Sequence, residues 1–342
     1  MKKILMLFSA LTAFSMPLCF SQESSSSEKI NNALNKTLST LVDVVPENTM
    51  LLSIEPDAHI GKFLPAIPPH FTAGLNITGT FTDTSNISDS INVILSQMKD
   101  TANEEITGIE QIDSILMNFK FPSKLPVPTC AVTGRIGGFV LPFDIGVFAV
   151  ALIPHSLDAV KFKDFSLGLD YMSFGADIRY AVFEGNILIP KISVGAGYIY
   201  SSQNIDFFAS STQTVKVENI EKNMNMKADM NMSLKVHTFY AQVQVSKSIL
   251  ILRPFIGARA RFSFIDANHK WNYNAEVEGI NEKATNNGSA TIKTDSFVWD
   301  EIQPQIYCGL GIKIPFVEFG LDAAWNPRTN MWSMGILTEF KM

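Results

Sequence analysis

Charged side chains recur along the chain at positions whose neighbours in sequence are apolar or small. Arg259 lies between two alanines, and Asp322 lies between Leu321 and Ala323. Because successive side chains of a β-strand point to opposite faces, these charges share one polar face of a sheet. The residues of this kind are Arg135, Asp144, Asp177, Arg179, Arg253, Arg259, Arg261, Lys313, Glu318, Asp322 and Glu339.

A polar face with this many charges has two interpretations. If it lines a channel, the charges form a constriction that tunes which solutes pass. Otherwise they form ion pairs that hold the strands in register, and structural ion pairs are the commoner case. The sequence leaves both open.

One segment that resembles a strand, 143–153, is apolar on both faces. Its second face carries Phe148, Val150 and Leu152. We predict that these three side chains either pack against a plug or line a path for an apolar solute.

Other chemistry finds little support. The five histidines show no metal-binding spacing, and His155 and Ser156 would point in opposite directions in an extended chain. Four methionines between 224 and 232 carry thioethers that suit Cu(I), but methionines at alternate positions more often form an apolar face. We therefore expect no enzymatic activity, no metal site and no cofactor.

Composition and the N-terminus indicate an exported protein. The 342 residues carry a formal net charge of −6, and no cluster of Lys or Arg supports nucleic-acid binding. Residues 1–21 have two lysines, an apolar run and a small residue at the end, which predicts a secretory signal peptide. After it, no apolar run reaches the ~18 residues that a membrane-spanning helix needs.

Alternation of apolar and polar residues dominates the chain after residue 70. Strands of this length with one apolar face are typical of a transmembrane antiparallel β-barrel of the outer membrane, with apolar side chains toward lipid and polar ones toward the lumen. A soluble sandwich is the alternative, but its strands are shorter. We predict about 10 strands, with 10–14 possible. They cover 71–81, 129–137, 143–153, 173–182, 192–200, 239–245, 255–264, 302–313, 317–325 and 332–340.

The connections between these strands alternate between short and long. With the C-terminus in the periplasm, every long connection falls outside the cell, as outer-membrane barrels require. Among them are 203–231 and 265–300, which we interpret as loops, and 83–127, which has helical spacing and predicts a helical extracellular insertion. Residues 22–69 contain an amphipathic helix, 28–44, and a Pro-rich lead-in. We predict that they form a plug in the lumen or lie in the periplasm, and that 70–342 form the barrel.

Three segments carry a family resemblance. They are PDAHIG at 56–61 with IPPHF at 67–71, GADIRY at 175–180, and the stretch 192–200. In these segments the chain resembles treponemal (spirochaete) outer-membrane barrels grouped with the long-chain fatty-acid transporter family. The resemblance implies a monomeric barrel with an N-terminal plug that admits hydrophobic molecules. The chain departs from the family in being short and in lacking its N-terminal Asn-Pro-Ala run.

Two functions follow as hypotheses. The first is an outer-membrane channel or transporter for small, hydrophobic, fatty-acid-like nutrients, with membrane lipid and a hydrophobic small molecule as its partners. The second is a structural or adhesin-like barrel whose outer loops bind other molecules. Inward glycines leave room in the lumen, which favours transport. They are Gly175, Gly195, Gly197, Gly257, Gly309, Gly311, Gly320 and Gly335.

Overall fold

The structure is a computed structural model of the chain. It describes residues 26–62, 70–83, 89, 93, 96, 109–110, 124–138, 141–151, 158–162, 165–186, 188–217, 220–279, 283–293 and 301–342. The predicted signal peptide, 1–21, lies outside the described residues.

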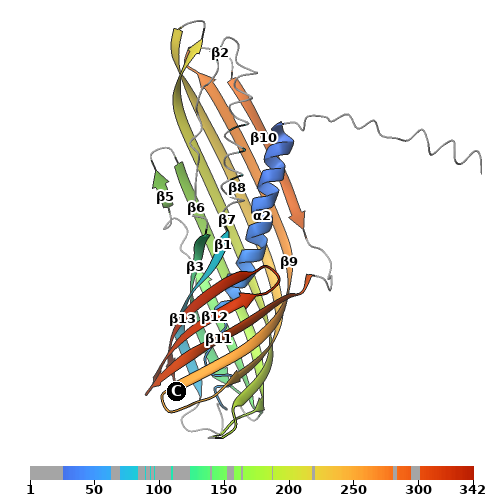
Figure 1. Cartoon of the computed structure of the whole chain (residues 1–342), viewed down its shortest axis with the longest axis vertical. Helices are drawn as coiled ribbons and strands as arrows, with labels where there is room; N and C mark the ends of the chain where they lie inside the picture. Colours follow the sequence, from blue (N-terminus) through green and yellow to red (C-terminus); the bar gives the residue numbers. More distant parts are fainter. Residues whose placement is uncertain are drawn as a thin grey trace, which may run out of the picture.

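Ten antiparallel strands close into a barrel, as the alternation predicted (Figure 1). Within the ring, closure gives each strand a paired neighbour on both sides and leaves no exposed edge, which is what hydrocarbon surroundings demand. The last strand pairs with the first, so that Thr338 faces Leu75, and the N–H of Phe71 donates to the carbonyl of Met342 at 3.2 Å. In ring order the strands are β1 (Phe71–Asp83), β3 (Lys124–Gly137), β4 (Phe143–Ala151), β6 (Phe165–Phe183), β7 (Lys191–Val217), β8 (Ile220–Ser246), β9 (Leu252–Val277), β11 (Gln303–Ile314), β12 (Val317–Asn326) and β13 (Met331–Lys341).

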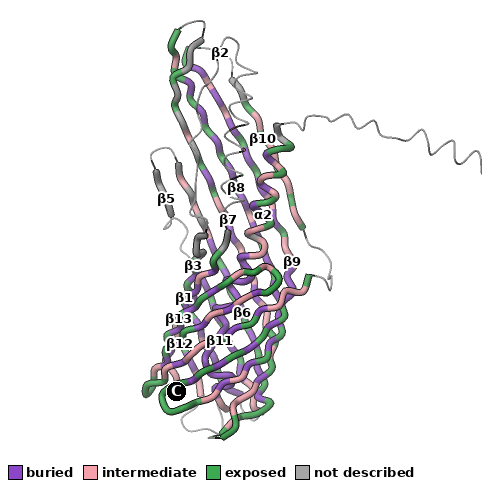
Figure 2. The backbone as a smooth tube through the Cα atoms, in the orientation of Figure 1, coloured by how far each residue is buried: buried purple, intermediate pink, exposed green. Residues whose placement is uncertain are grey.

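The two faces of the barrel differ in polarity along each strand. On β1, Leu75 and Ile77 are both 54% exposed, whereas Asn76 and Thr78 between and beside them are buried. The same alternation of exposed and buried residues runs around the barrel wall in Figure 2. An outer surface of exposed Leu, Ile, Val and Phe would be unstable in water and matches a lipid-facing belt.

Three strands continue far beyond the ring. β7, β8 and β9 remain paired to Val217, Ile220 and Val277, and β10 (Lys283–Lys293) adds to the outer edge of β9. The interpretation of 203–231 and 265–300 as loops was therefore wrong: most of both segments is strand. We call the part of β7, β8 and β9 beyond the barrel, together with β10, the ribbon (Figure 1). Two short strands accompany these long ones, β2 (Ile109–Glu110) on β7 and β5 (Asp158–Phe162) on β6.

Most of the predicted insertion at 83–127 lies outside the described residues. Asp89, Val93 and Ser96 are helical, and Val93 packs against the ribbon. At 109–110, within this predicted helical insertion, the backbone instead pairs with β7 as a strand, because an edge of the ribbon is available there.

The helix at the N-terminus, α2 (Ser26–Leu51), is longer than the predicted 28–44. It stands against the ribbon and its C-terminal end enters the barrel, while the C-terminus of the chain lies at the opposite end of the molecule (Figure 1). The helix does not lie wholly in the lumen: its apolar stripe packs on the ribbon, and only its C-terminal end is inside the barrel. No helix of the described residues is long and apolar enough to cross a membrane.

Candidate functional site

The lumen of the barrel is filled by the chain's own N-terminal segment. Residues 44–60 are all buried, and we call 47–60 the plug segment. Its first part is the last turn of α2, which tightens where the N–H of Ile54 donates to the carbonyl of Leu51 at 2.9 Å. From there the chain runs on through the barrel to Ile60.

Glu47 anchors the upper end of the plug segment. Its carboxylate accepts from Nη2 of Arg261 at 2.8 Å and from Nε2 of Gln305 at 2.9 Å, and Asn326 donates to the same group. These three partners come from β9, β11 and β12, so one side chain ties the helix to three strands of the wall.

The C-terminal end of α2 is satisfied by the wall. A helix leaves its last carbonyls without intrahelical partners, and here Arg259 donates to the carbonyl of Met50 while Asn76 donates to that of Leu51 at 3.1 Å. The guanidinium of Arg259 lies 5.0 Å from the ring of Tyr240 and 4.9 Å from that of Tyr307. A cation at the negative end of the helix dipole stabilises this arrangement.

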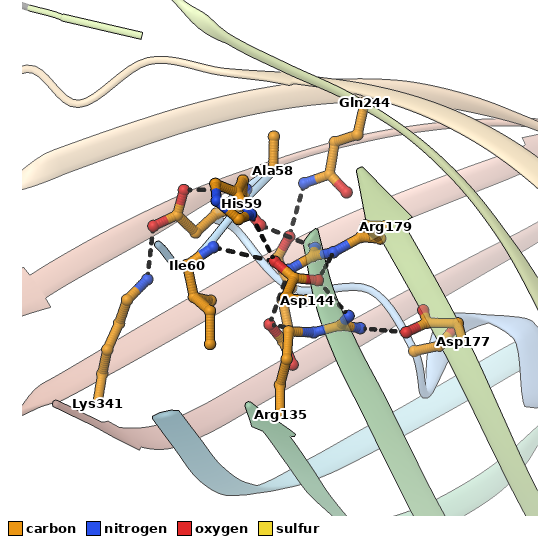
Figure 3. A network of polar contacts seen from close by, with 12 residues as sticks. Ala58, His59, Ile60, Arg135, Asp144, Asp177, Arg179, Gln244 and Lys341 are labelled. Atoms are coloured by element: carbon orange, nitrogen blue, oxygen red, sulfur yellow. Dashed lines mark hydrogen bonds and ion pairs between the residues drawn. The ribbon is translucent and has the colours of Figure 1, made fainter. Parts of the chain in front are cut away.

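Asp144 on β4 is the centre of the lower network (Figure 3). Its carboxylate accepts from Arg135 at 2.7 Å and from Arg179 at 2.8 Å. It also lies 3.1 Å from Nδ1 of His59 and accepts from the N–H of Ile60 at 3.1 Å. Wall and plug segment therefore share one buried carboxylate.

Two carboxylates of the plug segment complete this network. Glu55 accepts from Nε of Arg135 at 3.0 Å. Asp57 lies within ion-pair distance of three basic side chains from three strands: Lys191 at 2.9 Å, Lys341 at 2.6 Å and Arg253 at 3.2 Å. Buried charges are costly unless paired and hydrogen-bonded, and here the pairing requires the plug segment to stay in place. The arrangement keeps the lumen closed.

The predicted apolar path also contacts the plug segment. Phe148 and Val150 are buried in one cluster with Met50 and Leu52. Leu152 lies outside the described residues. In this structure Phe148 and Val150 therefore pack against the plug segment.

Above the lumen, the inner face of the ribbon is apolar. On β8 the inward side chains change from Thr238 and Gln242 inside the barrel to a run from Met224 to Val236 in the ribbon. We call the ribbon's apolar inner face the trough. Four buried side chains of α2 cover it: Ile30, Leu34, Leu38 and Val45. Its members are Phe207 of β7, Met224, Met226, Ala228, Met230, Met232, Leu234 and Val236 of β8, and Ala267, Trp271, Tyr273, Ala275 and Val277 of β9.

The helix packs onto the trough through Ile30, Leu34 and Leu38, which are fully buried. Two polar contacts fix its position. Nε1 of Trp271 donates to Asn31 at 2.8 Å, and Nε2 of His269 lies 3.2 Å from Oδ1 of Asn35. Burial lowers the pKa of His269 below its ordinary value, because the charged imidazolium is poorly solvated there.

Of the eleven charged residues predicted to face the lumen, ten are buried in the barrel. They do not surround an open passage, because the plug segment occupies their centre. For Lys313 the prediction was wrong. Its side chain is exposed at the rim, since it lies near the β11–β12 turn. Glu318 pairs with Arg253, whereas the carboxyl groups of Asp322 and Glu339 face inward with oxygens that lack a hydrogen-bond partner among the described residues.

The inward glycines do not leave an empty lumen. A Cβ built on Gly311 would lie 2.7 Å from Cβ of Pro56, and one on Gly320 would lie 2.9 Å from Cγ of the same proline. At Gly175 the space is taken by the ring of Phe148. These positions need glycine so that the plug segment and large side chains fit, which removes the argument for transport drawn from them.

Sequence reasoning missed five charged residues of the site. Glu47, Glu55 and Asp57 belong to the plug segment, whose charges carried no periodic signal. Lys191 and Lys341 lie at strand ends, on the polar face of β7 and β13, and the alternation could have included them.

A comparison with models of protein families gives one match. A family model described as Lsa36-like matches residues 132–340, which run from β3 to β13 and are more than half of the chain. No curated protein gives a match. These matches do not test a treponemal origin.

Solved structures with detectable likeness include three membrane proteins. The translocator domain of the autotransporter NalP from Neisseria meningitidis has 7% identity and a TM-score of 0.34, over 91% of this chain and 97% of that one. A FadL homologue from Pseudomonas aeruginosa has 7% identity and a TM-score of 0.26, over 80% and 89%. The toluene transporter TbuX from Ralstonia pickettii has 8% identity and a TM-score of 0.22, over 80% and 88%. At such TM-scores the likeness carries no inference about function.

Proposed function

The chain belongs to the Lsa36-like family, and we propose that it is an outer-membrane channel held shut by its own N-terminal segment, which opens to admit small hydrophobic solutes. The family match begins at residue 132, after the plug segment, so the gate is a feature of this chain's own N-terminal part. We also propose that the barrel works as a monomer without catalysis, since its ring closes within one chain.

The observation that carries the proposal is the trough. A second apolar cluster inside the barrel contains Phe148 and Val150, and α2 contacts both clusters, the trough through Ile30, Leu34 and Leu38 and the second cluster through Met50. An apolar solute could take the place of the helix, because methionine side chains are flexible and polarizable and adapt to ligands of different shape. Displacement of α2 would then uncover the trough and the second apolar cluster in the barrel.

The closed state needs a driving force to open. Burying an aliphatic side chain contributes about 1.5–3 kcal/mol, and Ile30, Leu34 and Leu38 are all fully buried on the trough. A solute that binds the trough competes with these contacts. Binding energy is therefore available to shift the equilibrium from the docked helix toward the released one.

The test weakens helix docking in the full-length protein. Leu34→Asp places a charge on the buried stripe, and Asn32→Asp places the same charge on the exposed side of the same helix. We expect Leu34→Asp to raise the conductance of the purified protein in planar bilayers and Asn32→Asp to leave it at the wild-type level.

A second measurement locates the solute. A photoreactive apolar probe, 3-trifluoromethyl-3-phenyldiazirine, is added to the protein in lipid bilayers, and its adducts are mapped by mass spectrometry. Leu34→Asp should increase labelling of trough peptides relative to lipid-facing peptides, which serve as an internal reference. Unchanged conductance and labelling would contradict the proposal.

A second function is favoured by one specific observation, the filled lumen. A barrel that binds host or neighbouring molecules through its outer parts does not need an open pore, and the ribbon offers an extended surface beyond the membrane belt. If Leu34→Asp folds and stays impermeable, this adhesin-like function becomes the better account.

A further inference from the structure

Each carboxylate of the plug segment is paired with one or more basic side chains of the barrel wall, and we call each such group a cluster. Glu47 lies against Arg261, and Glu55 lies against Arg135 and Arg179. The three clusters follow one another along the lumen, and the third, around Asp57, is the most complete. Its basic members are Lys191, Arg253 and Lys341.

The cluster around Asp57 has the geometry of a carboxylate-binding site. Lys191 lies 2.9 Å from Oδ1, while Lys341 lies 2.6 Å and Arg253 3.2 Å from Oδ2, so both oxygens are engaged. The three cations come from β7, β9 and β13, and their backbones are held by the closed barrel. Charge-assisted hydrogen bonds of this kind are the strong ones in proteins.

Two wall cations depend on the plug segment for their charge partner. Among the described residues, the ion pairs of Lys191 and Arg261 are with Asp57 and Glu47, respectively. By contrast, Arg135 and Arg253 also reach carboxylates of the wall, Asp177 and Glu318. Removing the plug segment would thus leave part of the wall's positive charge uncompensated.

The number of charged side chains on the wall also indicates an excess of positive charge. Of the described side chains that face the lumen, seven are basic and five are acidic when the plug segment is left out. The basic residues are Arg135, Arg179, Lys191, Arg253, Arg259, Arg261 and Lys341, and the acidic ones are Asp144, Asp177, Glu318, Asp322 and Glu339. A wall with surplus buried cations requires anions for compensation, because an unpaired buried charge is strongly unfavourable.

We propose that the barrel wall binds small organic anions bearing a carboxylate, and that Glu47, Glu55 and Asp57 occupy these sites in the closed state. The plug segment then acts as a built-in substitute for the ligand. Passage of such an anion rests on the proposed opening of the lumen, whereas its binding does not. The two can therefore be tested apart.

Binding is tested by chemical rescue in the full-length protein. Asp57→Ala removes the carboxylate and leaves its three cations, so we expect a lower thermal unfolding midpoint in detergent micelles. Sodium acetate should restore most of this loss, whereas sodium chloride at the same ionic strength should not. Leu52→Ala, in the same plug segment, removes apolar packing and should gain nothing from acetate beyond its effect on the wild type.

Glu47→Ala provides an independent second site should Asp57→Ala not fold. Acetate should restore its midpoint as well, because Arg261 and Gln305 remain in place. If acetate is no better than chloride for the folded variants, the anion sites do not exist and the proposal is overturned.

Passage is tested by ion selectivity. In a potassium chloride gradient, the channel opened by Leu34→Asp should show a reversal potential of the sign set by chloride, with chloride several-fold more permeant than potassium. An open but cation-selective channel would refute anion passage. If no conductance is seen, the proposed opening of the lumen is contradicted instead. The acetate experiment still decides whether the wall binds carboxylate anions.

Discussion

Nζ of Lys341 lies 2.6 Å from Oδ2 of Asp57, which joins the last strand of the barrel to the N-terminal plug segment. Between them in sequence lies the whole barrel, and the same lysine also reaches Glu318 at 3.4 Å. The pairing of β13 with β1 places Lys341 opposite Thr72, and from this position its side chain reaches Asp57. Closure of the barrel and seating of the plug segment are therefore coupled.

The lower network should be essential for stability. Asp144→Asn removes, in a fully buried position, the nearer of the two carboxylates that Arg135 and Arg179 share, and leaves only the second shared carboxylate, Glu55. Breaking a buried ion pair from one side costs about 3–5 kcal/mol, and we expect a loss of this size in chemical denaturation of the refolded protein.

An exposed ion pair serves as the control for Asp144→Asn. Glu184 lies 3.2 Å from Lys62 with its side chain 54% exposed. Glu184→Gln should cost about 1 kcal/mol or less, as surface pairs do. Equal losses for the two variants would show that Asp144 does not act through buried pairing.

The facing of β9 can be tested at neighbouring residues. Ala258 lies on the exposed face of β9 with Ile256 and Ala260, and Arg259 points into the lumen. Ala258→Arg should destabilise the barrel by roughly 2–4 kcal/mol in lipid vesicles, as for arginine near the bilayer midplane. Ala258→Leu, the matched control, should be close to neutral. A large loss for Ala258→Leu would place this face in the protein interior.

The barrel could be predicted from sequence because its signal is local. Alternation at single positions fixed which face of each strand meets lipid, and the closed ring requires no further information. The same reasoning misjudged the ribbon. There, the inner face is apolar because α2 covers it, so the polarity rule for a barrel wall no longer applies.

The plug segment could not be predicted in detail because its contacts are distant in sequence. Glu47 and Arg261 are 214 residues apart, and Asp57 and Lys341 are 284 apart. The periodicity of a sequence indicates to which face of its own strand or helix a side chain points. It does not indicate which distant residue that side chain contacts. The helix was found because its apolar stripe has a period near 3.6, but its partner on the ribbon carried the same alternating pattern as any strand.

The orientation of α2 predicts that the N-terminal end of the chain lies outside the cell. β1 starts at the same end of the barrel as the C-terminus, and the chain reaches it by passing through the lumen from the ribbon side (Figure 1). On intact cells, in a background of Cys130→Ala and Cys308→Ala, an impermeant thiol reagent should label Lys29→Cys. It should label Ser248→Cys, on the opposite turn, only after the outer membrane is permeabilised. The reverse pattern would show that the ribbon faces the periplasm.

Docking of α2 should depend on pH through His269, which lies in the ribbon against Asn35. Burial lowers the pKa of His269 in the docked state, whereas an exposed imidazole titrates near pH 6.5. The released state therefore binds a proton more readily, so the docked state loses stability as the pH falls through about 6.5 toward the lower docked pKa. Above about pH 7.5 the docked helix should be fully favoured.

The measurement is the distance between spin labels at Ser39 of α2 and Asn272 of β9, both of which are exposed. Lowering the pH from about 8 to about 5.5 should broaden the distance distribution as a fraction of helices is released, since protonation near the ordinary histidine pKa drives it. His269→Leu cannot titrate and keeps an apolar surface against the helix, so its distribution should stay narrow over this range. Glu28 and Asp43 on α2 are present in both proteins and serve as an internal control. If His269→Leu shows the same broadening as the wild type, the response belongs to those carboxylates and His269 is only a structural contact.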